Sequence, residues 1–522
     1  MTEPNPPQVT DRLSRPTLAL AFAGALAFLY LRTVLLPATP FVGTGDQTLF
    51  FSRAVRILHG QVLYRDFFEL VTPGTDLLYA AGFHLFGIHA WMIPAWTIAF
   101  GLTLACVITY IASRMLHGRL ILLPALLFLV FDFNSALDLT HHWFSTLAAV
   151  AAVAFLMDGT SVPRIYTASS LCAIATLFTQ TQGSLAFVAL IVYLLWLKRS
   201  GTQNANTLTQ LAALVLPFAL ILSSVLGYYI HKAGFNTVFS DLVLFPLRFL
   251  STGKANTPRA YLQQFPPVQS AADILRLIPF IFIYALVPYI YLFGFYQLWR
   301  RRNDLPPTLK QRLVLLHLVG IALFLAVANG PRFFRLSTVA PPAILILTWL
   351  LSRPSRGHSF ARTLLCILAA LFALLLPLRR QTQWHATLNL PIGRAAFGDI
   401  LLYREYQWLA QRTHPSEPFF NSPGLCLYLS LTNPTPSEFV SYDDFTRPEQ
   451  VSAIIQSLQH HPPHFVVLFS ENIKRSDSHD NAEPFRQYVH DNYHLAQTFP
   501  IHGSIQYDEQ IWELAPASES SR

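Results

Sequence analysis

Long apolar runs recur along most of this chain, and they constrain its fold more than any other feature. Lipid offers the backbone no hydrogen bonds, so a run of about 20 apolar residues is stable there only as a helix. Charged residues are 12% of 522 positions, against about 25% in soluble domains. The sequence predicts an all-α polytopic membrane bundle of about eleven spans, at 17–36, 92–115, 119–131, 143–158, 164–179, 183–198, 208–231, 274–299, 312–329, 336–352 and 360–378.

The loops between these spans divide into two sets by charge. Every second loop is basic, as in Arg300-Arg301-Arg302, and such loops lie in the cytoplasm by the positive-inside rule. This alternation of charge holds only if the apolar segment Leu77–Phe86, which is too short to span, lies at the membrane interface. Thr72-Pro73 indicates where this interfacial helix begins, with Thr72 as N-cap and Pro73 at N1. We therefore expect a multi-pass protein of a bacterial inner or plasma membrane with a cytoplasmic N-terminus. The segments expected outside are 37–91, 132–142, 232–273, 330–335 and the tail after 378.

The chain changes character after residue 378, where it becomes polar and rich in Pro and His. Val451–Leu458 predicts a short amphipathic helix, and His464–Phe469 predicts a buried strand. We predict a transmembrane domain at 1–378, with interfacial helices in its outer loop 37–91, and a small C-terminal α/β extracytoplasmic domain at 379–522. No catalytic motif stands out in the tail, so a packing or acceptor-facing role is expected.

Charge and cysteine usage exclude other classes of function. The net charge of +8 lies largely in short loops, where it sets orientation, so no nucleic-acid partner is predicted. The four cysteines are scattered and show no zinc-type spacing. We predict no cofactor and no metal-binding residue, and nothing in the sequence supports a divalent metal.

Unusual polar residues gather in the segments predicted to lie outside. Asp46, Phe50 and Arg53 recur at i, i+4 and i+7, so they share one face of a helix. A carboxylate two turns from a guanidinium suits a substrate with an acceptor hydroxyl at one end and a phosphate at the other. The alternative is a solvated interfacial helix with Asp46 as its N-cap. Further candidates for substrate binding in this loop are Arg56 and Tyr64.

The second outer loop carries Asp132, Asp138 and the pair His141-His142. Acidic residues so close to a membrane core are costly and usually functional. A second carboxylate there would hold the acceptor, orient a basic group or share a metal. Adjacent histidines point about 100° apart on a helix, so they do not suit one ion. They are more simply interfacial polar residues, and His142 is kept as a substrate-binding candidate.

Two arginines stand in a turn where positive charge is unexpected. Arg332 and Arg335 lie in the predicted outer turn before a span. Guanidinium groups there are suited to bind a phosphate by bidentate hydrogen bonds. The alternative is that they extend to lipid headgroups.

The first loop resembles the start of the GT-C glycosyltransferases, which include dolichyl-phosphate-mannose protein mannosyltransferases and bacterial aminoarabinose and RgtA/B/C/D-like sugar transferases. The acidic pair that follows the first helix in this family appears here as Asp46-Gln47, and its Pro-Leu-Tyr stretch appears as Pro73–Tyr79. The acidic residue of its next outer loop matches Asp138, or less well Asp132. The resemblance covers roughly residues 17–200 by motif and the remainder by layout.

This resemblance implies a GT-C-like bundle that transfers a sugar, with inversion, from a polyprenyl-phosphate carrier in the bilayer to an envelope lipid, glycan or protein. It implies Asp46 as the general base and a second catalytic carboxylate at Asp138. The arginines would stabilise the departing phosphate.

Three other functions fit a polytopic chain. A transporter or flippase of lipid-linked sugars would favour charged residues within spans and inverted repeats, whereas here the ionisable residues cluster on one side. A non-catalytic scaffold has no need of Asp46 and Asp138 on one side of the membrane. A polymerase or ligase of lipid-linked glycans would use an assembled glycan in place of a single sugar.

Overall fold

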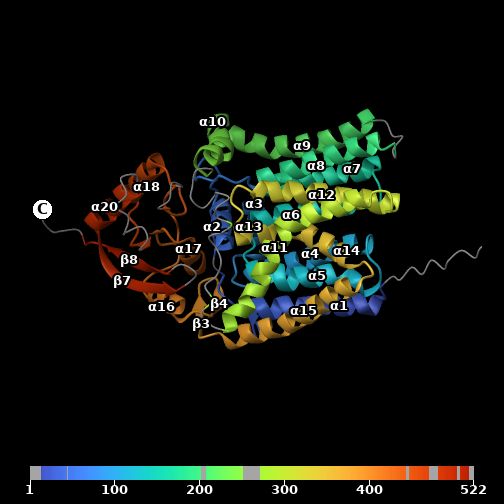
Figure 1. Ribbon diagram of the computed structural model, residues 1–522. Helices are drawn as coiled ribbons and strands as arrows, with labels where there is room; N and C mark the ends of the chain where they lie inside the picture. The colour runs from blue at the N-terminus through green and yellow to red at the C-terminus, as the bar shows by residue number, and fades with distance from the viewer. Residues whose placement is uncertain are drawn as a thin grey trace, which may run out of the picture.

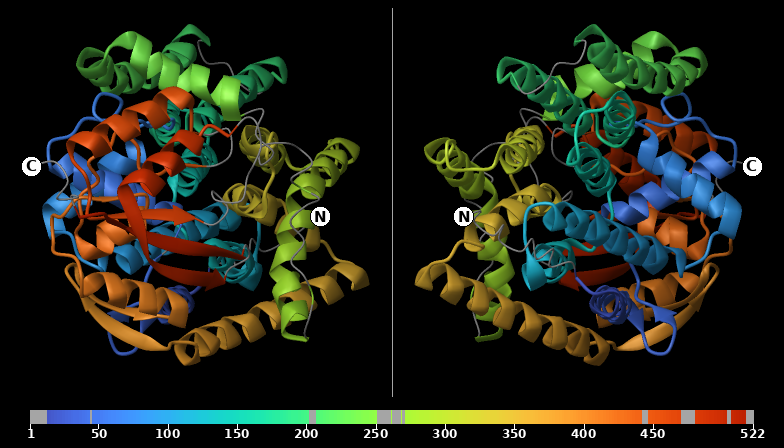
Figure 2. Two further views of the ribbon diagram at one scale, coloured as in Figure 1. Left: turned by 90° about the vertical axis from the view of Figure 1, so that its left-hand side faces the viewer. Right: turned by 90° about the vertical axis from the view of Figure 1, so that its right-hand side faces the viewer.

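The protein consists of a large helical bundle with a smaller C-terminal part against one of its ends (Figure 1). The computed structural model describes residues 13–43, 45–201, 207–250, 261, 268, 271–441, 446–469, 480–502 and 506–516. The predicted outer loop 232–273 and tail therefore lie partly outside the described residues. When the molecule is turned, the C-terminal strands lie in front of the bundle and cover its end (Figure 2).

The bundle is built from the apolar runs. The described residues contain eight helical segments long and apolar enough to cross a membrane, together with three shorter apolar helices. The eight long segments are α1 (Arg15–Thr33), α4 (Met92–Ser113), the composite segment Gly118–Ser135, α8 (Gln180–Arg199), α9 (Thr207–Ala233), α11 (Ala271–Arg300), α12 (Pro307–Val327) and α15 (Arg356–Thr382). The three shorter helices are α6 (His141–Leu156), α7 (Val162–Phe178) and α14 (Pro341–Leu351). The composite segment joins η1 (Gly118–Leu122), α5 (Leu123–Leu127), η2 (Phe128–Asp132) and η3 (Phe133–Ala136). The predicted all-α membrane bundle is confirmed.

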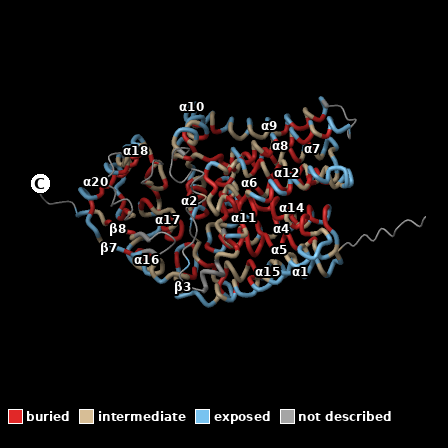
Figure 3. Tube along the Cα trace, in the orientation of Figure 1, coloured by how far each residue is buried: buried red, intermediate tan, exposed pale blue. Residues whose placement is uncertain are grey.

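Exposed apolar side chains cover the outside of the bundle. Leu20 of α1, Leu208 of α9 and Leu292 of α11 are 75%, 74% and 73% exposed. Buried residues concentrate between the helices, while α1, α9 and α15 show exposed and half-buried residues along their outer sides (Figure 3). An apolar surface of this extent is stable in lipid and not in water.

The predicted start of the span 336–352 was wrong, because two prolines separate this segment into two helices. Helix α13 (Phe333–Thr338) ends before Pro341 and Pro342, which occupy the first turn of α14. Proline lacks the N–H that would continue the earlier helix, but it suits the first helical position. The break leaves α13, with Arg335, as a separate short helix at the end of the bundle.

Two short helices of the first loop lie at the bundle end that faces the C-terminal part (Figure 1). Helices α2 (Asp46–Leu58) and α3 (Gly74–Phe86) pack through Phe51, whose ring centroid lies 4.3 Å from that of Tyr79. The predicted cap of α3 was wrong: the helix begins after Pro73, and the Thr72 hydroxyl donates to the Thr176 carbonyl at 2.7 Å. Thr72 thus ties the loop to α7.

Further short elements follow α1 and α9 along the chain. They are β1 (Val34–Leu35), β2 (Thr39–Pro40), α10 (Phe235–Phe239), η4 (Ser240–Leu244) and η5 (Pro246–Leu250). The first loop also reaches the C-terminal part directly, because the Val42 N–H donates to the Ala396 carbonyl at 2.8 Å.

The C-terminal part is a small α/β unit, as the sequence predicts. A hairpin of β3 (Ala386–Leu390) and β4 (Gly393–Phe397) precedes a four-stranded sheet of order β5-β6-β8-β7. In this sheet β5 and β6 are parallel and the other pairs antiparallel. Its strands are β5 (Phe419–Phe420), β6 (Phe465–Phe469), β7 (Tyr493–His502) and β8 (Gln506–Leu514), and its helices are α16 (Ile400–Ala410), α17 (Pro423–Leu429), α18 (Pro448–His460) and α20 (Glu483–Asn492). The predicted helix lies in α18 and the predicted buried strand in β6.

Candidate active site

The N-terminus of α2 is held by a carboxylate from the second outer loop. The backbone N–H groups of Asp46 and Gln47 donate to the two Asp138 oxygens, at 3.0 and 2.7 Å. Gly45 is the N-cap, with a φ of 87°, and a Cβ added to it would lie 2.5 Å from Asp138 Oδ2. Asp46 is therefore the first helical residue and not the N-cap, which corrects the alternative considered from the sequence. Capping by Asp138 leaves the Asp46 side chain available for another role.

The two carboxyl groups influence each other electrostatically. The Asp46 side chain is exposed, yet the protein around it desolvates its carboxyl enough to raise its pKa, against the opposing attraction of Arg53 and Arg335. Burial and the neighbouring Asp46 raise the pKa of Asp138 to about 7, against the opposing effect of its two backbone donors. Two like charges in one site cannot both ionise easily. One carboxyl with a raised pKa is well suited to accept a proton near neutral pH.

Three further side chains lie near this pair: Arg335, which attracts Asp46, and His141 and His142, which lie within electrostatic range of Arg335. The first turn of α6 places the His141 and His142 rings with centroids 3.9 Å apart, and His141 Nδ1 lies 2.8 Å from Thr179 Oγ1. Arg335 of α13 donates to the Gly330 carbonyl at 3.3 Å and attracts the Asp46 carboxylate. Three segments of the chain, α2, residues 138–142 and α13, thus bring together two carboxyls, two imidazoles and a guanidinium. Among the described residues, no group of three His, Cys, Asp or Glu side chains has the arrangement of a metal site.

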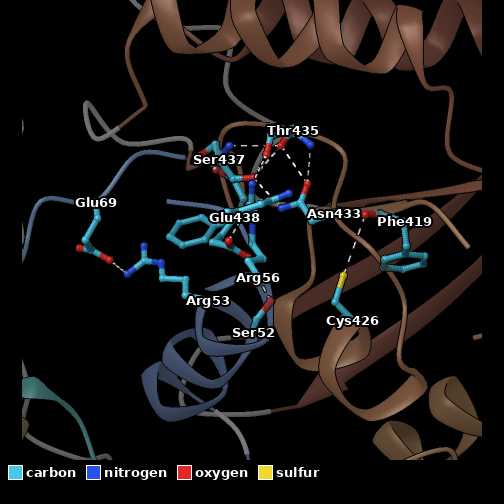
Figure 4. A network of polar contacts seen from close by, with 12 residues as sticks. Ser52, Arg53, Arg56, Glu69, Phe419, Cys426, Asn433, Thr435, Ser437 and Glu438 are labelled. Carbon is cyan, nitrogen blue, oxygen red and sulfur yellow. Dashed lines mark hydrogen bonds and ion pairs between the residues drawn. The ribbon is translucent and has the colours of Figure 1, made fainter. Parts of the chain in front are cut away.

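Arg53 and Arg56 lie on α2 as the periodicity predicts, but each has a carboxylate partner (Figure 4). Arg53 forms an ion pair with Glu69. Arg56 Nη1 lies 2.7 Å from Glu438 Oε1, and its Nη2 donates to the Thr435 carbonyl at 2.8 Å. Both arginines are only 7% exposed. These contacts favour a structural role over phosphate binding.

Tyr64 and Asp132 are buried outside the cluster. Tyr64 donates its hydroxyl to the Val71 carbonyl at 2.8 Å, and its ring meets the edge of Tyr229. Asp132 is fully buried in the π-helical turn η2. Neither residue lines the cavity beside Asp138. Tyr64 therefore contributes to packing, and of the two acidic residues in the loop only Asp138 adjoins that cavity.

A cavity of about 370 Å³ opens beside the capped end of α2. Gln47, Asp138 and Phe334 line one part of it, while Arg32 of α1 and Arg380 of α15 line another. Sequence reasoning did not single out Arg32 or Arg380, because each ends an apolar helix where a cation is ordinarily attributed to headgroup contact. Arg332 of the outer turn is half-buried and does not line this cavity, whereas its neighbour Phe333 does.

Comparison with solved structures identifies the fold. ArnT from Cupriavidus metallidurans, solved with undecaprenyl phosphate, matches with a TM-score of 0.57 at 14% identity, over 96% of this chain and 98% of that one. The archaeal oligosaccharyltransferase AglB from Archaeoglobus fulgidus, solved with an inhibitory peptide and a dolichol-phosphate, matches with a TM-score of 0.51 at 12% identity, over 87% and 69%. No protein-family model and no curated protein matches the sequence. The chain is an integral membrane protein with the GT-C fold, as the sequence resemblance implied.

Proposed function

We propose that this protein is a membrane glycosyltransferase that moves a sugar from a polyprenyl-phosphate carrier to an acceptor of the cell envelope, with inversion. The observation that carries the proposal is Asp46: an accessible carboxylate with a raised pKa, on a helix fixed by Asp138, at one end of an apolar GT-C bundle. The two solved neighbours hold polyprenyl-type phosphates, which supports the choice of donor.

In this mechanism Asp46 accepts the proton of the acceptor hydroxyl. The freed oxygen forms a bond to the anomeric carbon from one face, while the bond from that carbon to the phosphate oxygen breaks on the other. The electron pair of the broken bond leaves with the polyprenyl phosphate. Arg335 lies within electrostatic range of Asp46, so it is placed to stabilise the growing negative charge, with Arg332 beside it.

Asp138 acts differently from Asp46 in this proposal. Both of its oxygens accept backbone N–H groups of α2, so it orients the helix that carries the base. The neighbouring Asp46 carboxylate helps to raise the pKa of Asp138 to about 7, so Asp138 gives up its proton less readily. His142 lies near Phe334, with ring centroids 6.3 Å apart, and is proposed to contact the sugar or acceptor.

The test is sugar transfer by purified Asp46→Asn protein. Labelled polyprenyl-phosphate sugar would be incubated with an envelope extract, and release of free polyprenyl phosphate and labelling of the acceptor would be measured. We expect Asp46→Asn to lower the rate by about 10²- to 10⁴-fold while thermal unfolding stays unchanged. Asp304→Asn is the matched control, because Asp304 is exposed in the turn between α11 and α12. Activity above about a tenth of wild type would exclude Asp46 as the base.

The same experiment separates the alternatives. A transporter or flippase has no reason to cleave the donor in detergent, so donor intact after incubation with the acceptor extract would favour it. A polymerase or ligase would cleave only a carrier that bears an assembled glycan. Comparing a single-sugar donor with a glycan donor distinguishes that function from transfer of one sugar.

A further inference from the structure

Three arginines meet where the ends of α1 and α15 lie together, on the same side of the bundle as Asp46. They are Arg32 of α1 and Arg379 and Arg380 of α15, and the two latter side chains repel Arg32 electrostatically. Gln381 holds the two helix ends together, because its Nε2 donates to the Leu31 and Val34 carbonyls at 2.8 and 2.7 Å. The cluster is thus a fixed feature of the fold.

None of the three guanidinium groups has a carboxylate partner within the described part of the chain. Arg32 Nε donates to Asn134 Oδ1 at 2.5 Å and its Nη1 donates to the Leu376 carbonyl at 3.2 Å. The Arg380 guanidinium lies 3.8 Å from the centroid of the Phe41 ring. All three arginines are half-buried. Partly desolvated like charges held close together are costly without an anion between them.

Two cavities adjoin at this cluster. One is the cavity of about 370 Å³ beside Asp138, which Arg32 and Arg380 line. The other has about 550 Å³ and is mainly apolar, with Phe280 and Leu375 in its wall and Arg379 beside them. Both cavities include Ser135 and Phe333, so they are neighbours. An amphiphile with an anionic head and an apolar chain matches this pattern of charge and hydrophobicity.

We propose that the cluster of Arg32, Arg379 and Arg380 binds the phosphate head of a membrane lipid whose apolar chain occupies the 550 Å³ cavity. Guanidinium groups suit phosphate oxygens because they donate parallel, charge-assisted hydrogen bonds. Two kinds of membrane lipid offer this chemistry: an isoprenoid phosphate, such as the carrier of the proposed reaction, and a phospholipid. The inference rests on the proposed function and deepens it by adding a lipid-phosphate site at the Asp138 cavity, distinct from Arg332 and Arg335, which do not line that cavity. Its test uses binding alone, so it can fail or succeed independently of sugar transfer.

The experiment measures binding to the full-length protein in detergent with four probes: geranylgeranyl phosphate, geranylgeraniol, dioleoyl phosphatidic acid and inorganic phosphate. The variants are Arg32→Gln and the double variant Arg379→Gln/Arg380→Gln. The double variant is needed because Arg32 also bonds within the protein, so its loss alone risks misfolding. Arg362→Gln is the matched control, since Arg362 lies near the other end of α15. Leu375→Trp fills the apolar cavity without changing charge.

We expect the phosphate lipid to bind more tightly than geranylgeraniol and inorganic phosphate, and each arginine variant to weaken that binding by about 10- to 100-fold. Leu375→Trp should also weaken it, and Arg362→Gln should not. Preference for geranylgeranyl phosphate assigns the site to an isoprenoid phosphate, bound in addition to the donor at Arg335, and preference for phosphatidic acid assigns it to a phospholipid. Equal binding of geranylgeraniol, or wild-type affinity in both arginine variants, would overturn the inference.

Discussion

Replacing Arg56 with methionine tests how the C-terminal part is joined to the helix that carries Asp46. In the native protein the Arg56 guanidinium contacts Glu438 at 2.7 Å, the Thr435 carbonyl at 2.8 Å and Gln61 Oε1 at 2.6 Å. Its Cζ lies 4.3 Å from the centroid of the Phe67 ring. The side chains of Arg56 and Glu438 are only 8% and 1% exposed. This pair is therefore screened little by solvent.

The cost of the substitution follows from what it leaves behind. Methionine fills most of the volume but removes the cation, so Glu438 stays buried with the Ser52 hydroxyl, at 3.2 Å, as its remaining side-chain donor. Breaking a buried ion pair in this way typically costs about 3–5 kcal/mol. Replacing both residues, as Arg56→Met/Glu438→Met, removes the isolated charge, so the double variant should recover part of that loss. The coupling energy between the two sites should be about 1–3 kcal/mol.

Thermal unfolding of the native protein, Arg56→Met, Glu438→Met and the double variant in one detergent completes this double-mutant cycle. Arg65→Met is the control, because the side chains of the Arg65–Asp66 ion pair are 45% and 31% exposed and ion pairs in contact with solvent contribute little to stability. We expect Arg56→Met to unfold well below the Arg65→Met control, with earlier proteolysis of residues beyond 382. Equal stability of these two variants, or additive effects in the cycle, would refute the view that this ion pair fastens the C-terminal part to α2.

The remaining predictions concern the two carboxyl pairs. Gly45→Ala should lower both transfer activity and thermal stability, since its Cβ would lie 2.5 Å from Asp138 Oδ2 and an alanine with positive φ costs about 1–2 kcal/mol; wild-type values in both assays would contradict the cap geometry. Asp138→Asn leaves one amide oxygen where two carboxylate oxygens accept the N–H groups of Asp46 and Gln47, so it should lower thermal stability and transfer activity together; wild-type values in both assays would show that Asp138 does not hold α2. In the C-terminal part, burial raises the pKa of both Glu405 and Glu509, which also interact with each other. The folded state therefore binds protons more tightly at this pair, so the stability that the pair contributes should be fully present below the ordinary carboxyl pKa and be lost as pH rises through the raised values. Glu405→Gln should flatten this dependence in thermal unfolding measured against pH, and an unchanged slope would argue against the pair.

The sequence by itself determined the elements whose formation depends on local pattern. The length of each apolar run fixed the helices of the bundle, because backbone in lipid must satisfy its own hydrogen bonds. The spacing of Asp46, Phe50 and Arg53 placed them on one helix, α2, because helical period relates side-chain direction to sequence separation. A short apolar run within the polar tail located the strand β6. These predictions required no knowledge of which residues contact each other in the folded protein.

Only the tertiary structure decided what each polar side chain contacts. Asp138 caps α2 from 91 residues away, and Glu438 holds Arg56 from 382 residues away. Arg32 and Arg380 also meet from distant segments. No local pattern encodes these partners, because an ion pair or a cap depends on which surfaces pack together. The sequence therefore indicated which residues carry charge at one end of the bundle, and the packing determined that Arg53 and Arg56 are paired while Asp46 stays exposed.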